Sequence, residues 1–241
     1  MEPPNLHITR GIIASTLDEA RAMHNAFISG GPQPGIEIAR SLGDLSHNVY
    51  TPADGVDTGF AAKPDELLFV DRWAEPDGME AFFSNPSAQE AGDRLYSSRE
   101  ESEWTPAPGG FTFWVPAPSG TTAPFIAMTR RPAPSASAAI TALTEFAVST
   151  LPAARRRGQV SHALFVRRAD VIVARPASNA RHDGGKRTAE SVEPVEFLTM
   201  DSWLTLEGLQ EHYSDASRIN GLPSTRHHTV VWQQAPGFSE W

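Results

Sequence analysis

Cysteine is absent from the 241 residues, so disulfide bonds and thiolate chemistry are excluded. No apolar run approaches the roughly 20 residues that cross a bilayer, and the start Met1-Glu-Pro-Pro has neither the basic residues nor the apolar centre of an export signal. The formal net charge of −9 argues against a nucleic-acid partner, because phosphate binding needs a basic surface. We therefore expect a cytoplasmic protein with no membrane and no nucleic-acid partner.

What remains is the composition of a folded protein. Apolar residues make up 40% of the chain, which is enough to build a core. Because domains of roughly 100 to 150 residues are the commonest, a chain of this length is more typical of two domains than of one. The Pro- and Gly-containing segment 116–124 is the natural linker, and we predict domains at 1–118 and 119–241.

One segment of the chain occurs twice. Glu66–Trp73 and Glu196–Trp203 share a pattern of apolar residues that ends in Asp-x-Trp, and a short helical stretch with an aromatic pair follows each. The Asp, the Trp and the next Gly lie 130 positions apart in the two copies, and a fixed offset is the signature of an internal repeat. A Ser-His pair precedes each copy, and a Trp-containing strand follows each, at Phe111–Trp114 and Val230–Trp232.

The first half predicts the order strand, helix, strand, strand, helix, strand. Residues 6–13 and 42–50 alternate like strands, Thr16 and Glu19 form a capping box at a helix start, and residues 87–98 favour a second helix before the strand 111–115. This order is that of the ferredoxin-like unit, and the second half repeats it. The second half also has a polar insertion at 177–187, expected to be an exposed mobile loop, and an aromatic tail at 235–241, expected to pack on the body.

These motifs resemble the antibiotic biosynthesis monooxygenase-like family of the dimeric α/β-barrel superfamily. The residues that carry the resemblance are Val70–Trp73 with Ala81–Phe83, Met200–Trp203 with Glu211–Tyr213, and the two Ser-His strands. The resemblance implies an α+β fold in which two ferredoxin-like βαββαβ repeats form an intramolecular dimeric α/β-barrel, a pseudo-dimer within one chain. A further homodimer of the whole chain stays open.

Several enzymes of this family oxidise aromatic polyketides with molecular oxygen, without metal or flavin, and related branches degrade haem. The resemblance therefore implies a cofactor-independent monooxygenase that acts on a small aromatic, polyketide-like substrate, with haem as the minor alternative. Such chemistry needs a base, an apolar pocket and hydrogen-bond donors. His47 and His162 are the candidate bases, because imidazole titrates near neutrality. The candidate substrate-binding residues are Asn48, Trp73, Phe83, Arg94, Trp203, His212, Tyr213 and His228.

Each assignment has an alternative without function. The two Trp residues could pack in the core, Asp71 and Asp201 are typical of helix or turn caps, and the Ser-His pairs could fix strand register. His24, on an apolar helix stripe, is interpreted as a core or boundary residue. The rival function is a non-catalytic, ligand-binding or stress-related barrel. An enzyme should bring a polar group to an enclosed apolar cavity.

The two candidate pockets differ chemically, because Asn48 corresponds to Ala163 and Phe82 to His212, so only one pocket needs to be competent. The number of histidines in the second half suggests a metal site, but none of them has the close sequence spacing of known metal ligands. We predict no metal site from this group, which comprises His162, His182, His212, His227 and His228.

Overall fold

The computed structural model describes residues 4–55, 63–115, 123–133, 135–176, 195–214 and 228–241. The first half of the chain forms β1 Asn5–Ile13, α1 Leu17–Ser29, α2 Gly35–Ser41, β2 Asp44–Pro52, β3 Glu66–Trp73, α3 Pro76–Phe83, α4 Pro86–Leu95 and β4 Tyr96–Pro106. The second half forms β5 Phe113–Trp114, β6 Phe125–Ala133, α5 Ala136–Arg156, β7 Gln159–Pro176, β8 Val195–Trp203, α6 Leu206–Ser214 and β9 His228–Gln234.

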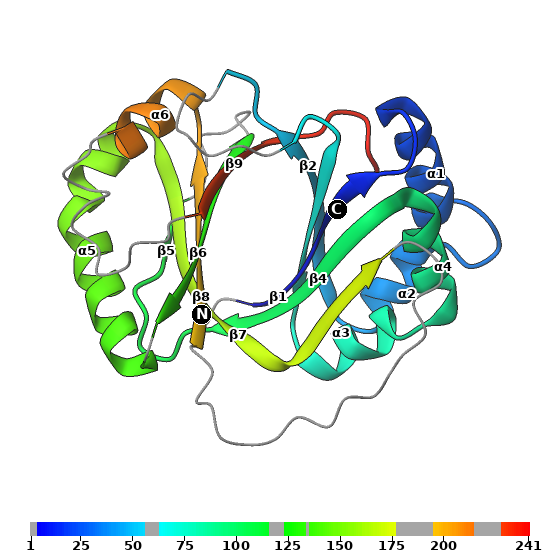
Figure 1. Ribbon diagram of the computed structural model, residues 1–241, viewed down its shortest axis with the longest axis horizontal. Helices are drawn as coiled ribbons and strands as arrows, with labels where there is room; N and C mark the ends of the chain where they lie inside the picture. The colour runs from blue at the N-terminus through cyan, green and yellow to red at the C-terminus, as the bar shows by residue number, and fades with distance from the viewer. Residues whose placement is uncertain (1–3, 56–62, 116–122, 134, 177–194, 215–227) are drawn as a thin grey trace.

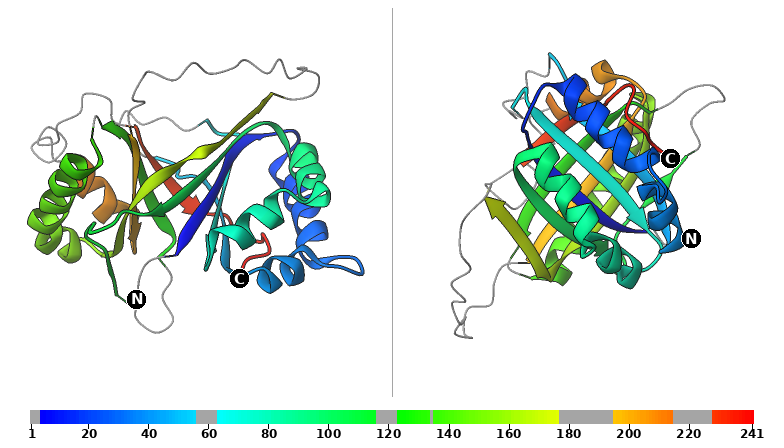
Figure 2. Two further views of the ribbon diagram at one scale, coloured as in Figure 1. Left: turned by 90° about the horizontal axis from the view of Figure 1, so that it is seen from below. Right: turned by 90° about the vertical axis from the view of Figure 1, so that its right-hand side faces the viewer.

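All of these strands belong to one antiparallel sheet. Its nine strands run in the order β4-β1-β3-β2-β9-β6-β8-β7-β5, and a further pairing of β4 with β7 closes eight of them into a barrel. Strand β5 pairs with the start of β7, and β4 pairs with the rest of the same edge. Helices α1 to α4 cover one side of the barrel, and α5 and α6 cover the opposite side (Figures 1 and 2).

This architecture corrects the predicted fold class. Two ferredoxin-like βαββαβ repeats that form an intramolecular pseudo-dimer would keep two sheets, whereas strands of both halves are hydrogen-bonded into one closed barrel. The joins are β2 with β9, over Tyr50–Pro52, and β4 with β7, over Ser98–Pro106. Pairing in this way satisfies edge strands that would otherwise expose unpaired backbone groups.

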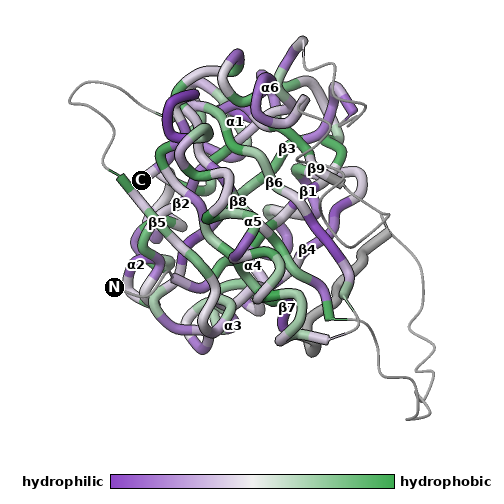
Figure 3. Tube along the Cα trace, turned by 90° about the vertical axis from the view of Figure 1, so that its left-hand side faces the viewer, coloured by the Kyte–Doolittle hydropathy of each residue, from purple (hydrophilic) through white to green (hydrophobic). Residues whose placement is uncertain are grey.

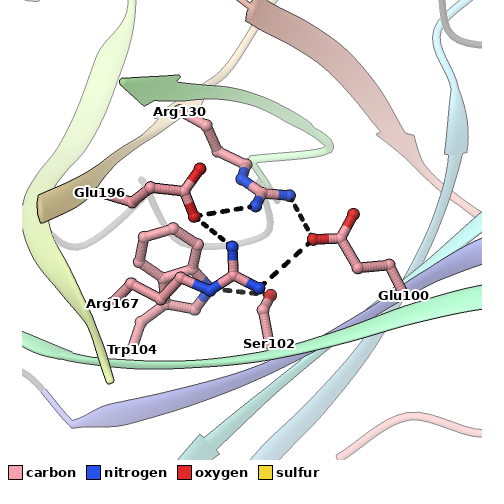
Figure 4. Close-up of polar contacts among 6 residues, drawn as sticks. All are labelled: Glu100, Ser102, Trp104, Arg130, Arg167 and Glu196. Carbon is pink, nitrogen blue, oxygen red and sulfur yellow. Dashed lines mark hydrogen bonds and ion pairs between the residues drawn. The ribbon is translucent and has the colours of Figure 1, made fainter. Parts of the chain in front are cut away.

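The inward side chains of the strands fill the barrel. They form an apolar cluster that includes Trp104, Phe165 and Trp232, as expected when alternate residues of a strand face one side. One region of the interior is charged: Arg130 bridges Glu100 and Glu196, at 2.8 and 3.2 Å (Figure 4). Arg167 contacts the same two carboxylates, and both guanidinium groups lie over the ring of Trp104.

The outward side chains of the strands meet the helices. Trp73, fully buried, packs with Met79 and Phe82 of α3, while Trp203 packs with Leu209 of α6. Hydrophobic and hydrophilic residues alternate along the trace, as amphipathic elements require (Figure 3). No helix in the described ranges combines the length and the apolar character needed to span a membrane.

Several local predictions have a clear outcome. The capping box at the start of α1 is confirmed, since Thr16 and Glu19 cap each other's backbone amides. The strand expected to close the first half at 111–115 is wrong: β4 takes that place, and the short β5 pairs with β7. Residues 35–41 form a further helix, α2. Residues 116–122 of the expected linker and the insertion 177–187 lie outside the described residues.

Candidate active site

A histidine and an aspartate face each other across two strands of the first half. His47 of β2 lies opposite Asp71 of β3 in the strand register, and both side chains point to the helix-covered face of the barrel. His47 Nδ1 is 2.5 Å from Asp71 Oδ1, and the two residues are 4% and 5% exposed. Asp71 therefore holds an imidazole and does not cap a turn; the N-cap of α3 is Glu75.

His24 of α1 extends this pair. Its Nε2 lies 2.9 Å from Nε2 of His47, and its Nδ1 lies 3.1 Å from Oδ1 of Asn25. Burial, together with the neighbouring His47, lowers the pKa of His24 to about 3, so the ring is neutral. The interpretation of His24 as a core or boundary residue agrees with its burial, but it did not predict the contact with His47.

The three residues border a cavity of about 420 Å³. The cavity lies between the outer face of the sheet and helices α1, α2 and α4, and its wall is largely apolar. Phe27, Phe69 and Phe83 supply flat aromatic surface. Cavities of this size bind small molecules in many proteins, with a few polar groups that fix the orientation of the ligand.

The C-terminal segment 235–241 covers one end of this cavity, although it follows the last strand of the second half. The ring of Trp241 stacks on His47 with centroids 4.8 Å apart, and the backbones of the two residues exchange hydrogen bonds. Glu240 accepts a hydrogen bond from the backbone N–H of Val49 at 2.7 Å. The expectation that this aromatic tail packs on the body is confirmed, and Figure 1 shows it running from β9 toward α1.

Asp44 is a second carboxyl group in the cavity wall. It stands at the bulged start of β2, after Gly43, whose φ of 97° turns the chain into the strand. It is 5% exposed, and among the described residues neither of its carboxylate oxygens makes a hydrogen bond of good geometry. Burial, followed by repulsion from Asp71, raises the pKa of Asp44 to about 7, although His47, the backbone N–H of Ser46 and the side chain of Trp241 each act to lower it.

Arg99, the buried cationic group of the cavity wall, is already engaged. Arg99 of β4 donates to Glu101 and to Asp93, both at 2.6 Å, and to Gln89 at 3.2 Å. These acceptors occupy all three nitrogens of the guanidinium group. The buried Arg99 therefore supports the wall and is not free to pair with an anionic ligand.

A second histidine–aspartate pair occupies the corresponding place in the second half. His162 of β7 lies opposite Asp201 of β8, with Nδ1 and Oδ1 2.7 Å apart. Asp201 also accepts hydrogen bonds from Gln159 and from the hydroxyl of Tyr213, both at 2.6 Å. Burial favours its protonation, but His162 and these hydrogen bonds outweigh burial, so the pKa of Asp201 is lowered.

The structure places the other predicted binding residues in three settings. Phe83 and Arg94 line the cavity of the first half together with His47. Trp73 and Trp203 are fully buried against their helices, and His212 packs beside Trp203 with ring centroids 5.0 Å apart. Tyr213 donates a hydrogen bond to Asp201. Asn48 donates to Ser46 at 3.4 Å and is not part of the cavity wall. His228 belongs to β9. His182 and His227 lie outside the described residues.

Sequence reasoning missed Asp44, Trp241 and the link from His24 to His47. The only signal for Trp241 was the aromatic end of the tail, and Asp44 had none. Across the described ranges, no group of three or more His, Asp or Glu residues is arranged to hold a metal ion.

Comparison with solved structures identifies the fold. An anthrone oxidase-like protein superposes with a TM-score of 0.56 at 12% identity, over 99% of this chain and 93% of its own. A protein assigned as a monooxygenase from Lactobacillus acidophilus NCFM gives 0.52 at 10% identity, over 96% and 93%. The chain shares the fold of these two proteins.

The closed barrel also occurs in proteins with other names. A chlorite dismutase variant from Candidatus Nitrospira defluvii superposes with a TM-score of 0.50 at 12% identity, over 97% of this chain and 91% of its own. No protein-family model matches the chain, and no curated protein matches it in sequence. At these identities the likeness establishes the fold and leaves the activity to the chemistry of the site.

Haem, the minor alternative, can be tested against the cavity. Haem iron is commonly held by a free imidazole nitrogen. In the first half, Nδ1 and Nε2 of His24 and of His47 all have partners, namely Asn25, each other and Asp71. The cavity thus does not fit axial ligation by either ring. In the second half, His162 Nδ1 is held by Asp201, and among the described residues no hydrogen bond reaches its Nε2.

Proposed function

We propose that this protein is an oxidoreductase that oxidises a small hydroxylated aromatic molecule with molecular oxygen in the cavity of the first half. The observation that carries the proposal is a buried Asp71–His47–His24 hydrogen-bond chain that borders an apolar cavity of about 420 Å³. Titratable groups gathered in an enclosed apolar pocket are the default signature of an active site.

The lining suits a flat, oxygen-bearing ring. Phe27, Phe69 and Phe83 offer stacking surface, and an apolar wall increases the reactivity of a phenolate by removing water from it. Asp44, His47 and Asp71 stand on the neighbouring strands β2 and β3. A ring bound between them and the helices would present its hydroxyl group to Asp44, His47 and Asp71.

The reaction balances with substrate and oxygen alone. Ionisation of a hydroxyl group makes the ring electron-rich, and a substrate that carries a methylene carbon then supplies all four electrons that reduce O₂, together with two hydrogens. One oxygen atom enters the product, where it converts a methylene carbon into a carbonyl, and the other leaves as water. The protein binds and orients the ring, excludes water and moves the proton of the hydroxyl group.

The cofactor is part of the test. The anthrone oxidase-like protein and the chlorite dismutase share the fold, and their fold gives no support to the expectation that the chain works without a cofactor. We therefore propose oxidation in the first-half cavity and leave haem as an arm of the experiment.

The first half is proposed as the active one because its pocket differs from that of the second half. The two halves are proposed to be divergent copies of one segment, since each places a His–Asp pair at matching register. In the second, three donors hydrogen-bond to Asp201, whereas in the first no hydrogen bond of good geometry reaches Asp44 from the described residues. A buried acceptor in this state gains free energy when a ligand supplies a good hydrogen bond.

The experiment is oxygen uptake by the purified protein with a panel of polyhydroxylated aromatics, with and without added haemin. His47→Ala should lower turnover by about 100-fold or more, because it removes a buried group that stabilises the charge developing on the substrate, while His162→Ala should keep most of it. Glu211→Gln, an exposed change in α6, is the matched control. Equal turnover in both histidine variants would remove the first-half cavity from the chemistry, and uptake only with haemin would make haem the cofactor.

The second candidate is a binding protein that holds an aromatic molecule without changing it. It is favoured by one observation: Trp241 stacks on His47 and closes that side of the cavity. Saturable binding of the aromatic panel without oxygen uptake, in the presence and absence of haemin, would select this candidate.

A further inference from the structure

The side chain of Asn25 has a fixed orientation. The backbone N–H of Ser239 donates to its Oδ1 at 2.7 Å, and its Nδ2 donates to the backbone carbonyl of Gly237 at 2.9 Å. A backbone N–H can only donate and a carbonyl can only accept, so the amide cannot be flipped. The C-terminal segment therefore presents the Asn25 oxygen, and not its nitrogen, to His24.

This oxygen selects the tautomer of His24. Because Oδ1 only accepts, Nδ1 of His24 must carry the hydrogen of their 3.1 Å contact. The ring is neutral, so it has one hydrogen, and Nε2 is left with a lone pair. The 2.9 Å contact between the two Nε2 atoms then requires a hydrogen on Nε2 of His47.

The other nitrogen of His47 needs a hydrogen as well. Its Nδ1 is 2.5 Å from Oδ1 of Asp71, and this bond contains a second proton. The chain from Asn25 to Asp71 thus holds one proton more than two neutral imidazoles would carry. His47 and Asp71 thus share two protons, as an imidazolium with a carboxylate or as an imidazole with a carboxylic acid, and in both arrangements neither histidine has a lone pair to offer to a ligand.

Asp44 is the carboxylate of the cavity wall with the weakest hydrogen-bond partners. Among the described residues no hydrogen bond of good geometry reaches its two buried oxygens, and the backbone of Ser46 and the side chain of Trp241 act on it weakly, whereas Glu101 is taken by Arg99 and Asp71 by His47. We propose that Asp44, rather than His47, accepts the proton of a hydroxyl group bound in the cavity, and that His47 stays protonated and stabilises the resulting anion. The oxidation that follows this proton transfer rests on the proposed function. The proton transfer itself does not.

The surroundings favour this role. Asp71 of β3 repels the Asp44 carboxylate and His47 of β2 attracts it; neutral His24 faces the cavity from α1, and Arg40 of α2 lies over the ring of Trp241. Burial dominates, and the pKa of Asp44 is raised to about 7. A base whose pKa lies near the working pH is the most effective one.

The step is a simple proton transfer. The O–H bond of the ligand breaks, its electron pair stays on the ligand oxygen, and the proton binds one oxygen of Asp44. A hydroxyl compound and a carboxylate become an oxyanion and a carboxylic acid, with no change in oxidation state. The positive charge of His47, whose two N–H groups are engaged by His24 and Asp71, then stabilises the anion electrostatically.

Infrared difference spectroscopy tests the transfer directly. Phenol is un-ionised in water at pH 8, because a phenolic pKa is about 10, whereas Asp44 is then mostly ionised. Phenol binding should create the carbonyl band of a protonated carboxyl group in the parent and in Glu211→Gln, and not in Asp44→Asn. A missing band, a band that persists in Asp44→Asn, or no saturable binding would overturn the proposal.

The histidines have their own readout. Nitrogen-15 spectra of the imidazoles at neutral pH should show hydrogens on both nitrogens of His47, and on Nδ1 but not Nε2 of His24. A lone pair on Nε2 of His47 would restore that residue as the base and contradict the assignment to Asp44. Asn25→Asp, whose carboxylate accepts at both oxygens, should keep the His24 tautomer, whereas Asn25→Leu should lose it.

Turnover separates this inference from the proposed function. Asp44→Asn should lower kcat/KM for ordinary phenols by about 100-fold or more at pH 8 and should spare electron-poor phenols that are already ionised in water. Turnover without the carboxyl band would contradict the role of Asp44 alone. A band without any turnover would contradict the oxidation alone.

Discussion

At the scale of single residues, the site depends on which hydrogen-bond partners are present and which are missing. His47 could be singled out from the repeated Ser-His pair, but Asp71 was interpreted as a cap and His24 as a core residue. Their link depends on α1 crossing the face of β2, which no local pattern contains. Asp44 follows a glycine at a strand start, a common place for a solvated turn residue, so only the fold shows that it is buried.

Asp44 should make the protein less stable at neutral pH. Its pKa is about 7 in the folded state against an ordinary value of 3.8, so the unfolded state ionises first as the pH rises. The free energy by which Asp44 destabilises the folded state is near zero below about pH 4. It grows as the pH rises to about 7 and is constant above that pH. We expect Asp44→Asn to raise the free energy of unfolding by roughly 2 to 4 kcal/mol at pH 8.

The measurement is urea denaturation of parent and variant at pH 4, 6 and 8. Surface variant Asp18→Asn serves as the matched control, because Asp18 is exposed and pairs only with Arg21. A stability difference that is the same at all three values would contradict the assigned pKa.

At the scale of elements, strand β4 shows where sequence patterns mislead. Its outward residues Arg99, Glu101 and Glu103 look solvated, yet all three are buried and paired with one another or with Arg168. Because charged residues stand at alternate positions, the sequence pattern did not predict this strand. The neighbouring aromatic residues 111–115 were predicted as the last strand of the first half instead. The repeated strands β3 and β8 were predictable, because their apolar pattern is uninterrupted.

The C-terminal segment should protect the edge of β2 that borders the cavity. The amides of His47 and Val49 donate to Trp241 and Glu240, both in this segment. Removal of residues 236–241 should therefore increase hydrogen exchange at these two amides, because they lose their acceptors. Amides of β8 in the second half, such as that of Met200, provide the internal control.

Unchanged exchange at His47 and Val49 after the truncation would show that the segment is not seated on β2 in solution. The same variant should also bind phenol more weakly, because Trp241 lines the cavity and the segment orients Asn25.

At the scale of the whole molecule, sequence reasoning predicted a barrel within one chain but could not supply the strand pairings that join both halves into one closed sheet. The repeat predicted two equivalent halves, but pairing of β2 with β9 and of β4 with β7 joins residues that lie far apart in the chain. The charged cluster inside the barrel belongs to this closure, since Glu100 comes from the first half and Arg130, Arg167 and Glu196 from the second (Figure 4).

Because the halves share one sheet, they should unfold together. We expect a single calorimetric transition whose measured enthalpy equals the van't Hoff enthalpy, since neither half keeps its edge strands paired alone. Two resolved transitions, or a calorimetric enthalpy about twice the van't Hoff value, would show two independent units.

A molecule bound beside Asp44 and His47 should be oxidised by O₂. The fate of isotopically labelled oxygen tests this expectation. The parent protein would be incubated with ¹⁸O₂ and a polyhydroxylated aromatic that it binds, and the product analysed by mass spectrometry. We expect one labelled oxygen atom in the product of the parent protein and of Glu211→Gln, and no labelled product with His47→Ala. An unchanged substrate, or a product with oxygen from water only, would contradict it.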